Sequence, residues 1–577
     1  MTNKVPASFP VSTLVPLLAL SAVCAHAAEF SPVNTETLLN PDPADWLMFS
    51  RTYDAQRFSP LDQITTANVA AIAPAWSLEL PSGVSETIPL VHDGVMYFIA
   101  PGGAVMARNA TSGEQIWEYR RSADNLASRS KGLAVYDDLI YYTAPDSYVV
   151  AIDARTGTMR WEALTDSRGH TSAPLVVNGK VISGGACFSS RDNCYLVAHD
   201  ALTGEELWRF HTTPEAGEPG DESWHGAAVE NRLASTWGLP GAYDPVRNRI
   251  IWGVANAMPD LRMDRHNGNP AGTGFEAPAD LYTNSTIALN PDTGELDWYY
   301  QHLPGDDADL DHTHERTLVT TPVSPNPDFV KWINPNIEPG SVHDVAVNVS
   351  EGGSIFVNDR NSGEFLWAAP FPGDAPEMLL AGVDVNTGRT AINPALVADS
   401  HSQNRTICYW NTRSYWPTAY HPGTNSLYTS YIESCRQLEG SNWWVVPRPG
   451  SDPDKLTGLA KINLETGAVL KFDEGRAPGN GALLTTAGNL VFHGDLARQF
   501  KAFNAETGEA LWQTTLPGNI SVSTITYAVD GKQYVAVMAG DNLKVPELLT
   551  LVPELGPAAN QNGIYVFALP DALLVSE

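Results

Sequence analysis

Four aspartates crowd into the short stretch LPGDDADLDH (303–312): Asp306, Asp307, Asp309 and Asp311. Carboxylates this close repel one another unless water, a cation or hydrogen-bond donors compensate their charge. An EF-hand calcium loop that began at Asp307 would need Gly at its sixth position and Glu at its twelfth. The sequence has His312 and Leu318 there, so the stretch is either a solvated acidic turn or part of a site that works with a cation.

The elements that would position such a site repeat along the chain. One phrase recurs as NATSGEQIW (109–117), DARTGTMRW (153–161), DALTGEELW (200–208), NPDTGELDW (290–298), DRNSGEFLW (359–367) and NAETGEALW (504–512). A seventh copy, NLETGAVLK (463–471), has Lys471 in place of the Trp. Apolar stretches precede most copies and another begins at the Trp, so each copy predicts two strands joined by a turn with a left-handed Gly.

The spacing of these turns predicts the architecture. Successive glycines lie about 45 residues apart, which is the length of a four-stranded propeller blade. The longer gaps leave room for blades with a degenerate phrase. We therefore predict an all-β fold, an eight-bladed β-propeller that forms one domain over residues 28–577. The repeated tryptophans are expected to pack each blade against the next and not to bind a cofactor.

Composition limits the partners. Of the 577 residues, 43% are hydrophobic and 18% are charged, and 66 Asp plus Glu exceed 35 Lys plus Arg, for a net charge of −31. The length is sufficient for a large buried core. The acidic excess argues against nucleic acid and anionic membranes as partners, and it favours cations or a basic protein.

The N-terminal segment, residues 1–27, has the pattern of a secretory signal peptide. Lys4 precedes an apolar run, and Ala-His-Ala at 25–27 forms a small-x-small cleavage site. A membrane anchor would need a longer, uninterrupted apolar run, and lipid attachment at Cys24 would need a better residue than Val23 before it. No later stretch is long and apolar enough to span a bilayer. The sequence predicts a soluble, periplasmic protein.

The cysteines agree with export. Without Cys24 four remain, Cys187, Cys194, Cys408 and Cys435, and an even number suits an oxidising compartment. Of the three possible pairings we prefer Cys187–Cys194 and Cys408–Cys435, because each closes a local loop. Four free buried thiols are the alternative. The sequence contains no Cys-x-x-Cys-His motif, so no covalently attached c-type haem is expected on it.

The repeated phrase resembles the tryptophan-docking motif of the eight-bladed pyrroloquinoline quinone (PQQ) dehydrogenases. The family resemblance extends to DWLMFSRTYDAQRFSPLDQITTANVAAIAPAW (45–76), ETIPLVHDGVMYF (86–98), LYTNSTIALNPDTGELDWYYQHLPGDD (281–307) and GNLVFHGDLARQFKAFNAETGEALW (488–512). Within the family, the segment at 187–224 is most similar to the soluble sorbose-type and secondary-alcohol branch.

This resemblance implies a catalytic base and a metal site. It places the base at Asp309, since a carboxylate within hydrogen-bond reach of the alcohol can take its proton while hydride moves to the quinone. It assigns metal ligation to Asn256 and Asp309. Asp311 matches the extra Asp of lanthanide-using members, which would suit a trivalent ion, although Asp311 could instead be exposed or pair with Arg316. Ca²⁺ and a lanthanide both stay open.

The resemblance also implies a cofactor pocket. Trp237 matches the indole on which the flat PQQ ring stacks. Glu86 and Thr171 match polar residues that hydrogen-bond the cofactor, and Lys131 stands where an Arg commonly binds a PQQ carboxylate, although Lys lacks the bidentate fork. Trp416 is similar to an aromatic near the pocket, with a core position as the alternative.

The sequence departs from the family pattern at two charged positions. Methanol-type members have a metal-ligating Glu after a Gly-Gly-Ala stretch, where this chain has Cys187 or Phe188, and Asp192 could reach the site only if the small disulfide loop were reshaped. A basic residue near the quinone oxygens is replaced by Glu351. Arg360 belongs to the repeat's turn and cannot replace it.

The adjacent Cys-Cys pair of methanol-type members is also missing. We therefore expect a PQQ-dependent dehydrogenase for an alcohol larger than methanol, such as a polyol, a sugar or a secondary alcohol. It would use Ca²⁺ or a lanthanide and pass its electrons to a soluble acceptor, with a basic cytochrome c as the expected partner. A non-enzymatic propeller scaffold and a degenerate PQQ-binding protein without turnover are the alternatives.

Overall fold

The computed structural model describes residues 1–2, 30–121, 129–165, 169–188, 190–272, 274–439, 442–520, 523–556, 558 and 561–574. Nearly all of the predicted signal segment lies outside these residues. Within the described part of the chain, no helix combines the length and the apolar character needed to cross a membrane.

Strands dominate the described residues, and eight sheets contain four or five of them. The first four sheets in chain order consist of β3 (Leu90–His92), β4 (Val95–Ile99), β5 (Val105–Asn109) and β6 (Gln115–Tyr119); β7 (Leu133–Tyr136), β8 (Leu139–Thr143), β9 (Tyr148–Asp153) and β10 (Met159–Leu164); β11 (Leu175–Val177), β12 (Lys180–Gly184), β13 (Tyr195–Asp200) and β14 (Glu206–His211); β16 (Ala242–Asp244), β17 (Arg249–Gly253), β19 (Ser285–Leu289) and β20 (Leu296–Gln301).

The other four sheets complete the set. They consist of β21 (Thr317–Val323), β23 (Ser341–Val349), β24 (Ser354–Asp359) and β25 (Phe365–Pro370) with β22 (Trp332–Ile333); β29 (Ala419–His421), β30 (Ser426–Ile432), β33 (Thr457–Asn463) and β34 (Val469–Gly475); β35 (Leu484–Thr486), β36 (Leu490–Gly494), β37 (Gln499–Asn504) and β38 (Ala510–Thr515) with β1 (Phe58–Ser59); β39 (Ile525–Val529), β40 (Lys532–Ala539) and β41 (Gly563–Ala568) with β2 (Ala73–Glu79).

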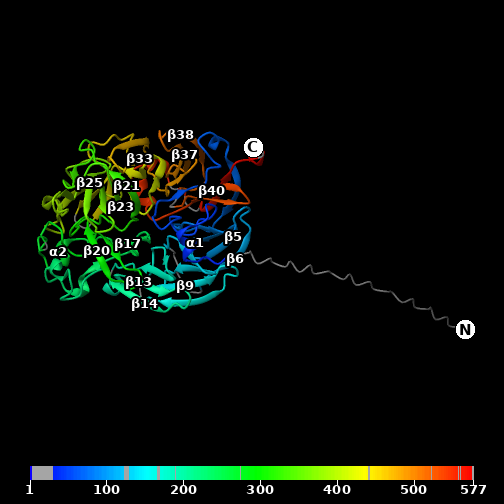
Figure 1. Ribbon diagram of the computed structural model, residues 1–577, viewed down its shortest axis with the longest axis horizontal. Coiled ribbons are helices and arrows are strands. Elements are labelled where there is room, and N and C mark those ends of the chain that lie inside the picture. The colour runs from blue at the N-terminus through cyan, green and yellow to red at the C-terminus, as the bar shows by residue number, and fades with distance from the viewer. Residues whose placement is uncertain are drawn as a thin grey trace.

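The sheets follow one another around a ring, with the chain colour advancing from blue to red until red segments lie beside blue ones (Figure 1). The first strands of neighbouring sheets contact each other, as β7 does with β11 and β16 with β21. The ring is closed by strand β2, which pairs antiparallel with β41 of the last sheet. This architecture confirms the prediction of an all-β propeller, and the eight sheets are the candidates for the eight predicted blades.

The repeated tryptophans pack as the sequence predicts. Gly157, in the turn between β9 and β10, has a φ of +71°, and a Cβ atom built on it would lie 2.7 Å from the ring of Trp117 in the preceding sheet. The Trp117 indole N–H donates to the carbonyl of Ala154 at 2.8 Å. The same pairing joins Trp76 to Gly113, Trp161 to Gly204, Trp208 to Gly294 and Trp298 to Gly363.

The degenerate seventh copy packs with another aromatic. Lys471 stands where the other copies have Trp, and the next residue, Phe472, faces the next sheet instead. A Cβ atom on Gly508 would lie 2.6 Å from Phe472 Cγ. The loss of the indole is therefore compensated one position later in the strand.

Smaller elements lie outside the eight sheets. The helices are short, α1 (Thr35–Leu39), α2 (Arg262–Arg265), α3 (Val545–Leu549) and α4 (Asp571–Leu574), and two strand pairs are formed by β15 (Leu233–Ala234) with β18 (Ala257–Met258) and by β26 (Leu380–Val383) with β27 (Thr390–Ile392). A three-stranded sheet contains β28 (Asn404–Cys408), β31 (Ser434–Glu439) and β32 (Asn442–Pro447).

Both predicted disulfides are present. Cys408 lies opposite Cys435 in the pairing of β28 with β31, and their Cα atoms are 4.4 Å apart. Cys187 pairs with Cys194 at a Cα separation of 4.9 Å. The prediction of two local loops closed by disulfides is confirmed.

Replacement of Gly157 by Ala should lower the free energy of unfolding by about 1–3 kcal/mol more than replacement of Gly531, because only the first substitution drives a methyl group into an indole. Gly531 has a similar φ, +77°, but nothing lies within 4 Å of an added Cβ. Urea denaturation of the two variants separates backbone strain from the ring clash. Equal losses would show that the indole contact contributes nothing.

Candidate active site

Residues from distant parts of the chain converge on one cavity of about 280 Å³. Half of the sixteen lining residues lie in segments that lead into the first strand of a sheet, and the other half lie in connections between the second and third strands of a sheet. The lining side chains are Glu86, Arg129, Lys131, Thr171, Phe188, Trp237, Asn256, Met258, Asp260, Asp309, Asp311, Glu351, Tyr415, Leu543, Lys544 and Glu547.

The four aspartates of the acidic stretch divide into two pairs. Asp306 accepts hydrogen bonds from the backbone N–H groups of Ala308 and Leu310 at 2.8 and 2.6 Å. Asp307 forms a buried ion pair with Arg405 at 2.6 Å. These two carboxylates hold the loop in shape, whereas Asp309 and Asp311 line the cavity. The stretch is thus not a solvated turn.

Asp309 is held in an unusual conformation. Its φ is +61°, a left-handed value that non-glycine residues adopt at a cost and often at functional positions. Its carbonyl accepts a hydrogen bond from the Trp410 indole at 3.2 Å, and Arg436 Nη1 lies 3.6 Å from its Oδ2. Its half-buried carboxylate therefore faces the cavity, and the guanidinium of Arg436 lies beside it.

Asp311 connects the other two predicted site residues. Its Oδ1 accepts the backbone N–H of Asn256 at 3.0 Å, and its Oδ2 accepts the indole N–H of Trp237 at 3.1 Å. The side-chain amide of Asn256 donates to Asp260 Oδ1 at 3.3 Å. Asp311 therefore does not pair with Arg316, which binds the carbonyls of His312 and His314 and the Thr286 hydroxyl.

A second group of contacts surrounds the side chain and the backbone carbonyl of Trp237. The Thr171 hydroxyl donates to the Trp237 carbonyl at 2.7 Å. The Lys131 ammonium lies 4.9 Å from the centre of the Trp237 ring and 3.8 Å from Glu86 Oε2. Tyr415 donates to Glu86 Oε1 at 2.7 Å. The structure thus brings Glu86, Lys131 and Thr171 together around the indole.

Trp416 alone among the predicted cofactor residues lies away from the cavity. It is fully buried in the core and packs edge-on against Tyr415 at a centroid distance of 5.7 Å. Tyr415, its neighbour in sequence, is the aromatic that lines the cavity. The core position that the sequence left open for Trp416 is the one observed.

Four charged residues that sequence reasoning missed also line the cavity: Arg129, Asp260, Lys544 and Glu547. Asp260 follows Asn256 by four residues, and the chain folds it back beside Asn256 and Arg436, whose Nη1 is 4.0 Å from Asp260 Oδ2. Lys544 comes from the connection between β40 and β41, where nothing in the local sequence marks it. Its ammonium lies 3.4 Å from Glu547 and 4.8 Å from the centre of the Trp410 ring.

Glu351 also faces the cavity, as expected from its place in the sequence. The Ser414 hydroxyl donates to it, and His314 Nε2 lies 3.7 Å away. Burial raises the pKa of Glu351 to about 7, although Lys544 opposes the shift. Burial likewise lowers the pKa of Lys544, but Glu351 and Glu547 more than offset this, so its pKa lies above the ordinary value.

Crowding of carboxylates dominates the electrostatics of the cavity. Burial and the neighbouring Asp309 raise the pKa of Asp260 to about 7. Burial raises the pKa of Asp311 well above its ordinary value, and Glu351 and Asp309 add to the shift. On the opposite side, burial lowers the pKa of Lys131 to about 8 against the attraction of Glu86. The carboxylate side of the cavity is therefore short of positive charge.

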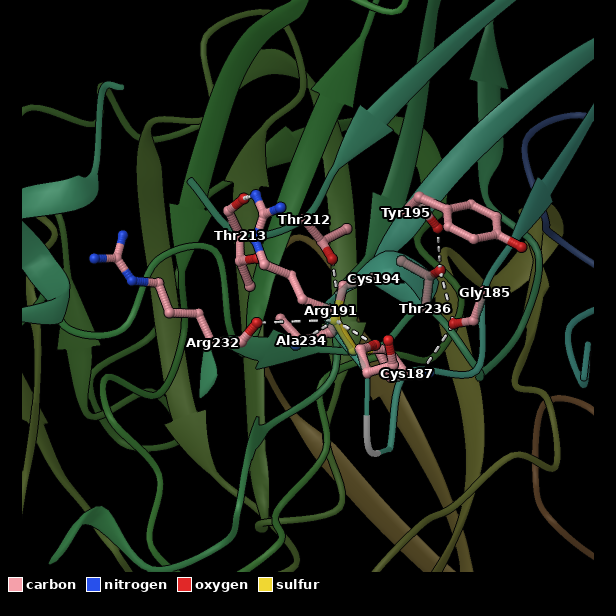
Figure 2. The surroundings of a disulfide bond; sticks show 12 residues. Gly185, Cys187, Arg191, Cys194, Tyr195, Thr212, Thr213, Arg232, Ala234 and Thr236 are labelled. Carbon is pink, nitrogen blue, oxygen red and sulfur yellow. Dashed lines mark hydrogen bonds between the residues drawn. A yellow bond between two sulfur atoms is a disulfide. The ribbon is translucent and has the colours of Figure 1, made fainter. Parts of the chain in front are cut away.

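The Cys187–Cys194 disulfide lies close to the segment that leads to Trp237. Figure 2 shows the disulfide and its surroundings. Ala234 donates to Cys194 Sγ at 3.4 Å. The Ser235 hydroxyl oxygen accepts the backbone N–H groups of both Cys187 and Trp237, each at 3.1 Å. The closed loop places Phe188 on the cavity wall, while Asp192 is exposed and does not reach the cavity.

The donors present fit a flat anionic quinone with a metal ion beside it. Trp237 offers a ring face, and Arg129 and Lys131 offer positive charge for carboxylates. Asp309 and Asp311 provide carboxylate oxygens of the kind that hard cations prefer, and the Asn256 amide provides a neutral one. Within the described residues, no group of three or more His, Cys, Asp or Glu side chains is placed to hold a metal ion.

Comparisons with known proteins identify related enzymes. The family model described as PQQ, glucose/ethanol/alcohol dehydrogenase, beta-propeller domain matches residues 46–157, 162–373 and 453–535. The quinohemoprotein alcohol dehydrogenase ADH-IIG of Pseudomonas putida is 32% identical over 92% of this chain and 78% of its own length. The quinoprotein alcohol dehydrogenase PedH of Pseudomonas putida is 28% identical over 97% and 98%.

Solved structures give the same result for the fold. The structure of ADHIIG from Pseudomonas putida superposes with a TM-score of 0.77 at 27% identity, over 93% of this chain and 82% of that chain. A europium-containing methanol dehydrogenase superposes with a TM-score of 0.76 at 24% identity, over 92% of this chain and 100% of that chain.

The finer resemblance to the sorbose-type branch stays a prediction. The family model covers more than half of the chain, and relatives above 30% identity extend over most of it. The chain therefore belongs to the PQQ-dependent alcohol dehydrogenases, an enzyme family that works with PQQ and a Ca²⁺ or lanthanide ion.

Proposed function

We propose that the protein is a periplasmic PQQ-dependent dehydrogenase that oxidises an alcohol larger than methanol to an aldehyde or ketone and passes the electrons to an external acceptor. The convergence of Asp309, Asn256 and Trp237 on one cavity carries this proposal. When bound, PQQ accepts a hydride from the alcohol carbon while the metal ion polarises the accepting carbonyl.

Different residues of the cavity would bind different parts of the cofactor and the metal ion. Trp237 would support the quinone ring. The hydrogen bond from its indole N–H to Asp311 orients the ring, and the hydrogen bond from Thr171 holds its backbone carbonyl. Arg129 and Lys131, on the same wall, would bind its carboxylates. Asn256, Asp309 and Asp311 would hold the metal ion, whose charge relieves the repulsion that raises the pKa of Asp311.

Asp309 would act as the general base. Its carboxylate faces the cavity, and its backbone carbonyl accepts the hydrogen bond from the Trp410 indole. Arg436, 3.6 Å from Oδ2, places a positive charge beside the carboxylate, which would accept the alcohol proton at an oxygen. The strained backbone is consistent with a side chain that is positioned for reaction.

Asp260 and Lys544 supply the two charges that are missing where the sequence departs from the family pattern. Asp260 brings a carboxylate next to Asn256 where the expected Glu is missing, and we assign it to the metal side of the cavity. Lys544 brings a positive charge to the wall that carries Glu351. It therefore replaces, from another segment, the basic residue that the sequence lacks near the quinone oxygens.

Several features support a substrate larger than methanol. Phe188, Met258 and Leu543 give the cavity apolar wall area, which would contact the carbon skeleton of a longer alcohol. The methanol-type adjacent Cys pair is absent from the sequence.

The predicted signal peptide and the two disulfides support a periplasmic location.

Reconstitution tests this function directly. Purified protein loaded with PQQ and either Ca²⁺ or La³⁺ should reduce an artificial dye when polyols, sugars or secondary alcohols are supplied. Asp309→Asn should lower kcat about 10²–10⁴-fold, the contribution of a positioned general base, with PQQ retained at the wild-type level by absorbance. Asp192→Asn, an exposed carboxylate, is the matched control. Failure of the wild type to take up PQQ would favour a scaffold, and uptake without dye reduction would favour a degenerate binder.

Asp311 should decide the choice of metal ion. Since a further carboxylate favours a trivalent ion, the wild type should be more active with La³⁺ than with Ca²⁺, and Asp311→Ala should reduce the La³⁺-dependent rate at least about tenfold. Dye reduction with each ion measures this. Full wild-type activity with Ca²⁺ alone would contradict the lanthanide role of Asp311.

The metal-free protein should become less stable as the pH rises. The folded state keeps protons on Asp260 and Glu351 up to a pKa of about 7, whereas the unfolded chain releases them near pH 4. The free energy of unfolding should therefore fall as the pH rises from about 4 to 7. Added La³⁺ must compete with these protons, so it should raise Tm more near pH 8 than near pH 5. A Tm gain that is independent of pH would rule out these carboxylates as part of the metal site.

A further inference from the structure

Two adjacent tryptophans are exposed on the three-stranded sheet. Trp443 and Trp444, near the start of β32, each keep 39% of their surface accessible. Large aromatic side chains are rarely left this exposed without a partner. Successive strand residues point to opposite faces of a sheet, so the two indoles face different surroundings.

Trp443 packs against Trp410, which is hydrogen-bonded to a residue that lines the cavity. Its ring lies 5.1 Å, edge to face, from the ring of Trp410. Trp410 in turn donates its indole N–H to the carbonyl of Asp309 at 3.2 Å. A continuous aromatic path therefore runs from the exposed surface to the backbone of the proposed catalytic base.

Cations hold this path together. The Arg436 guanidinium lies 4.7 Å from the centre of the Trp443 ring and 5.5 Å from that of Trp410, and the same side chain reaches Asp309. The Lys544 ammonium covers Trp410 at 4.8 Å and lines the cavity. The two indoles are thus fixed against the cavity by charged groups.

The sheet that carries Trp443 is cross-linked by a disulfide and packs against a helix. The Cys408–Cys435 disulfide joins β28 to β31, and Trp443 and Trp444 pair with Leu438 and Gln437 across β31 and β32. Helix α3, which follows Lys544, contacts β32. The indole of Trp443 is therefore presented at a fixed position relative to the cavity.

Each alcohol oxidation leaves two electrons on the cofactor. Its reoxidation releases two protons to solvent and needs two one-electron transfers, each reducing one ferric haem to the ferrous state. The sequence contains no Cys-x-x-Cys-His motif for a haem of its own. Its net charge of −31 attracts a basic partner by long-range steering, and Glu439 at the exposed end of β31 adds acidic charge to this sheet.

We propose that Trp443 is the contact point for a basic one-electron carrier of the c-type cytochrome class, and that electrons leave the cavity through Trp410 and Trp443. This inference rests on the proposed function, because it names the acceptor of the same reaction. Electron tunnelling weakens steeply with every gap in packing, so two indoles in contact provide a shorter path than solvent.

The test compares a protein acceptor with a small dye. With reconstituted holoenzyme and a basic cytochrome c, Trp443→Ala should lower kcat/KM for the cytochrome about tenfold, as expected for loss of an aromatic interface anchor. Reduction of phenazine methosulfate, which is small enough to approach the cavity itself, should change less than about twofold. Trp443→Phe should restore most of the cytochrome rate, because a ring is kept.

Trp444→Ala is the matched control, since Trp444 is equally exposed but faces the other side of β32. It should leave the cytochrome rate within about twofold of the wild type, and added salt should lower that rate for the wild type. Equal effects of the two substitutions, a parallel loss of the dye-linked rate in Trp443→Ala, or no salt dependence would each overturn the proposal. Absence of dye reduction in the wild type would instead refute the proposed function.

Discussion

The packing of an indole from one sheet onto a glycine of the next is the interaction on which the rest of the structure depends. The ring lies so close to Gly157 and its equivalents that no other residue fits, and the indole N–H satisfies a carbonyl of the same turn. Each sheet is therefore rotated against its neighbour in a fixed way. The segments that lead into the first strands and the connections between second and third strands consequently meet, which is how residues as distant as Glu86 and Lys544 line the same cavity.

The cavity itself is an electrostatic compromise. Asp260, Asp311 and Glu351 share a space with Asp309, and burial raises the pKa of each of the first three carboxyl groups. Water-filled surroundings would screen them, but the walls leave Arg436 and Lys544 as the cations on that side. Such an arrangement is costly for an empty protein and favourable for one that holds a cation, as functional sites often sacrifice stability for binding.

Local signals in the sequence were sufficient for the fold. The turn glycine and the Trp lie four positions apart in six of the seven phrases, and the Trp of one phrase packs on the glycine of a later one, so the propeller could be predicted from this repeat. The two disulfides close short loops and could be predicted for that reason. The positions of Asn256, Asp309 and Trp237 followed from family-like motifs that are each contiguous in sequence.

Longer-range features could not be predicted in the same way. Lys544 reaches the cavity only because the last connection of the ring folds over it, and no neighbouring residue marks it. Asp260 depends on how the chain turns after Asn256. At Trp416 the sequence could not distinguish the wall from the core, since two adjacent aromatics, Tyr415 and Trp416, satisfy either pattern. Phe472 replaces a missing indole from the adjacent position, which only three-dimensional packing reveals.

The pairing of β2 with β41 has a consequence for how the molecule is made. Residues near the beginning of the chain find their strand partner only after almost all of it has been synthesised, so the seam between them carries one of the longest loop closures possible in this molecule. Until that moment β2 and the incomplete sheet both present open edges to other chains. We expect the nascent protein to be most vulnerable to misassembly where β2 pairs with β41. Loss of either strand by truncation should leave an open row of sheets instead of a closed ring.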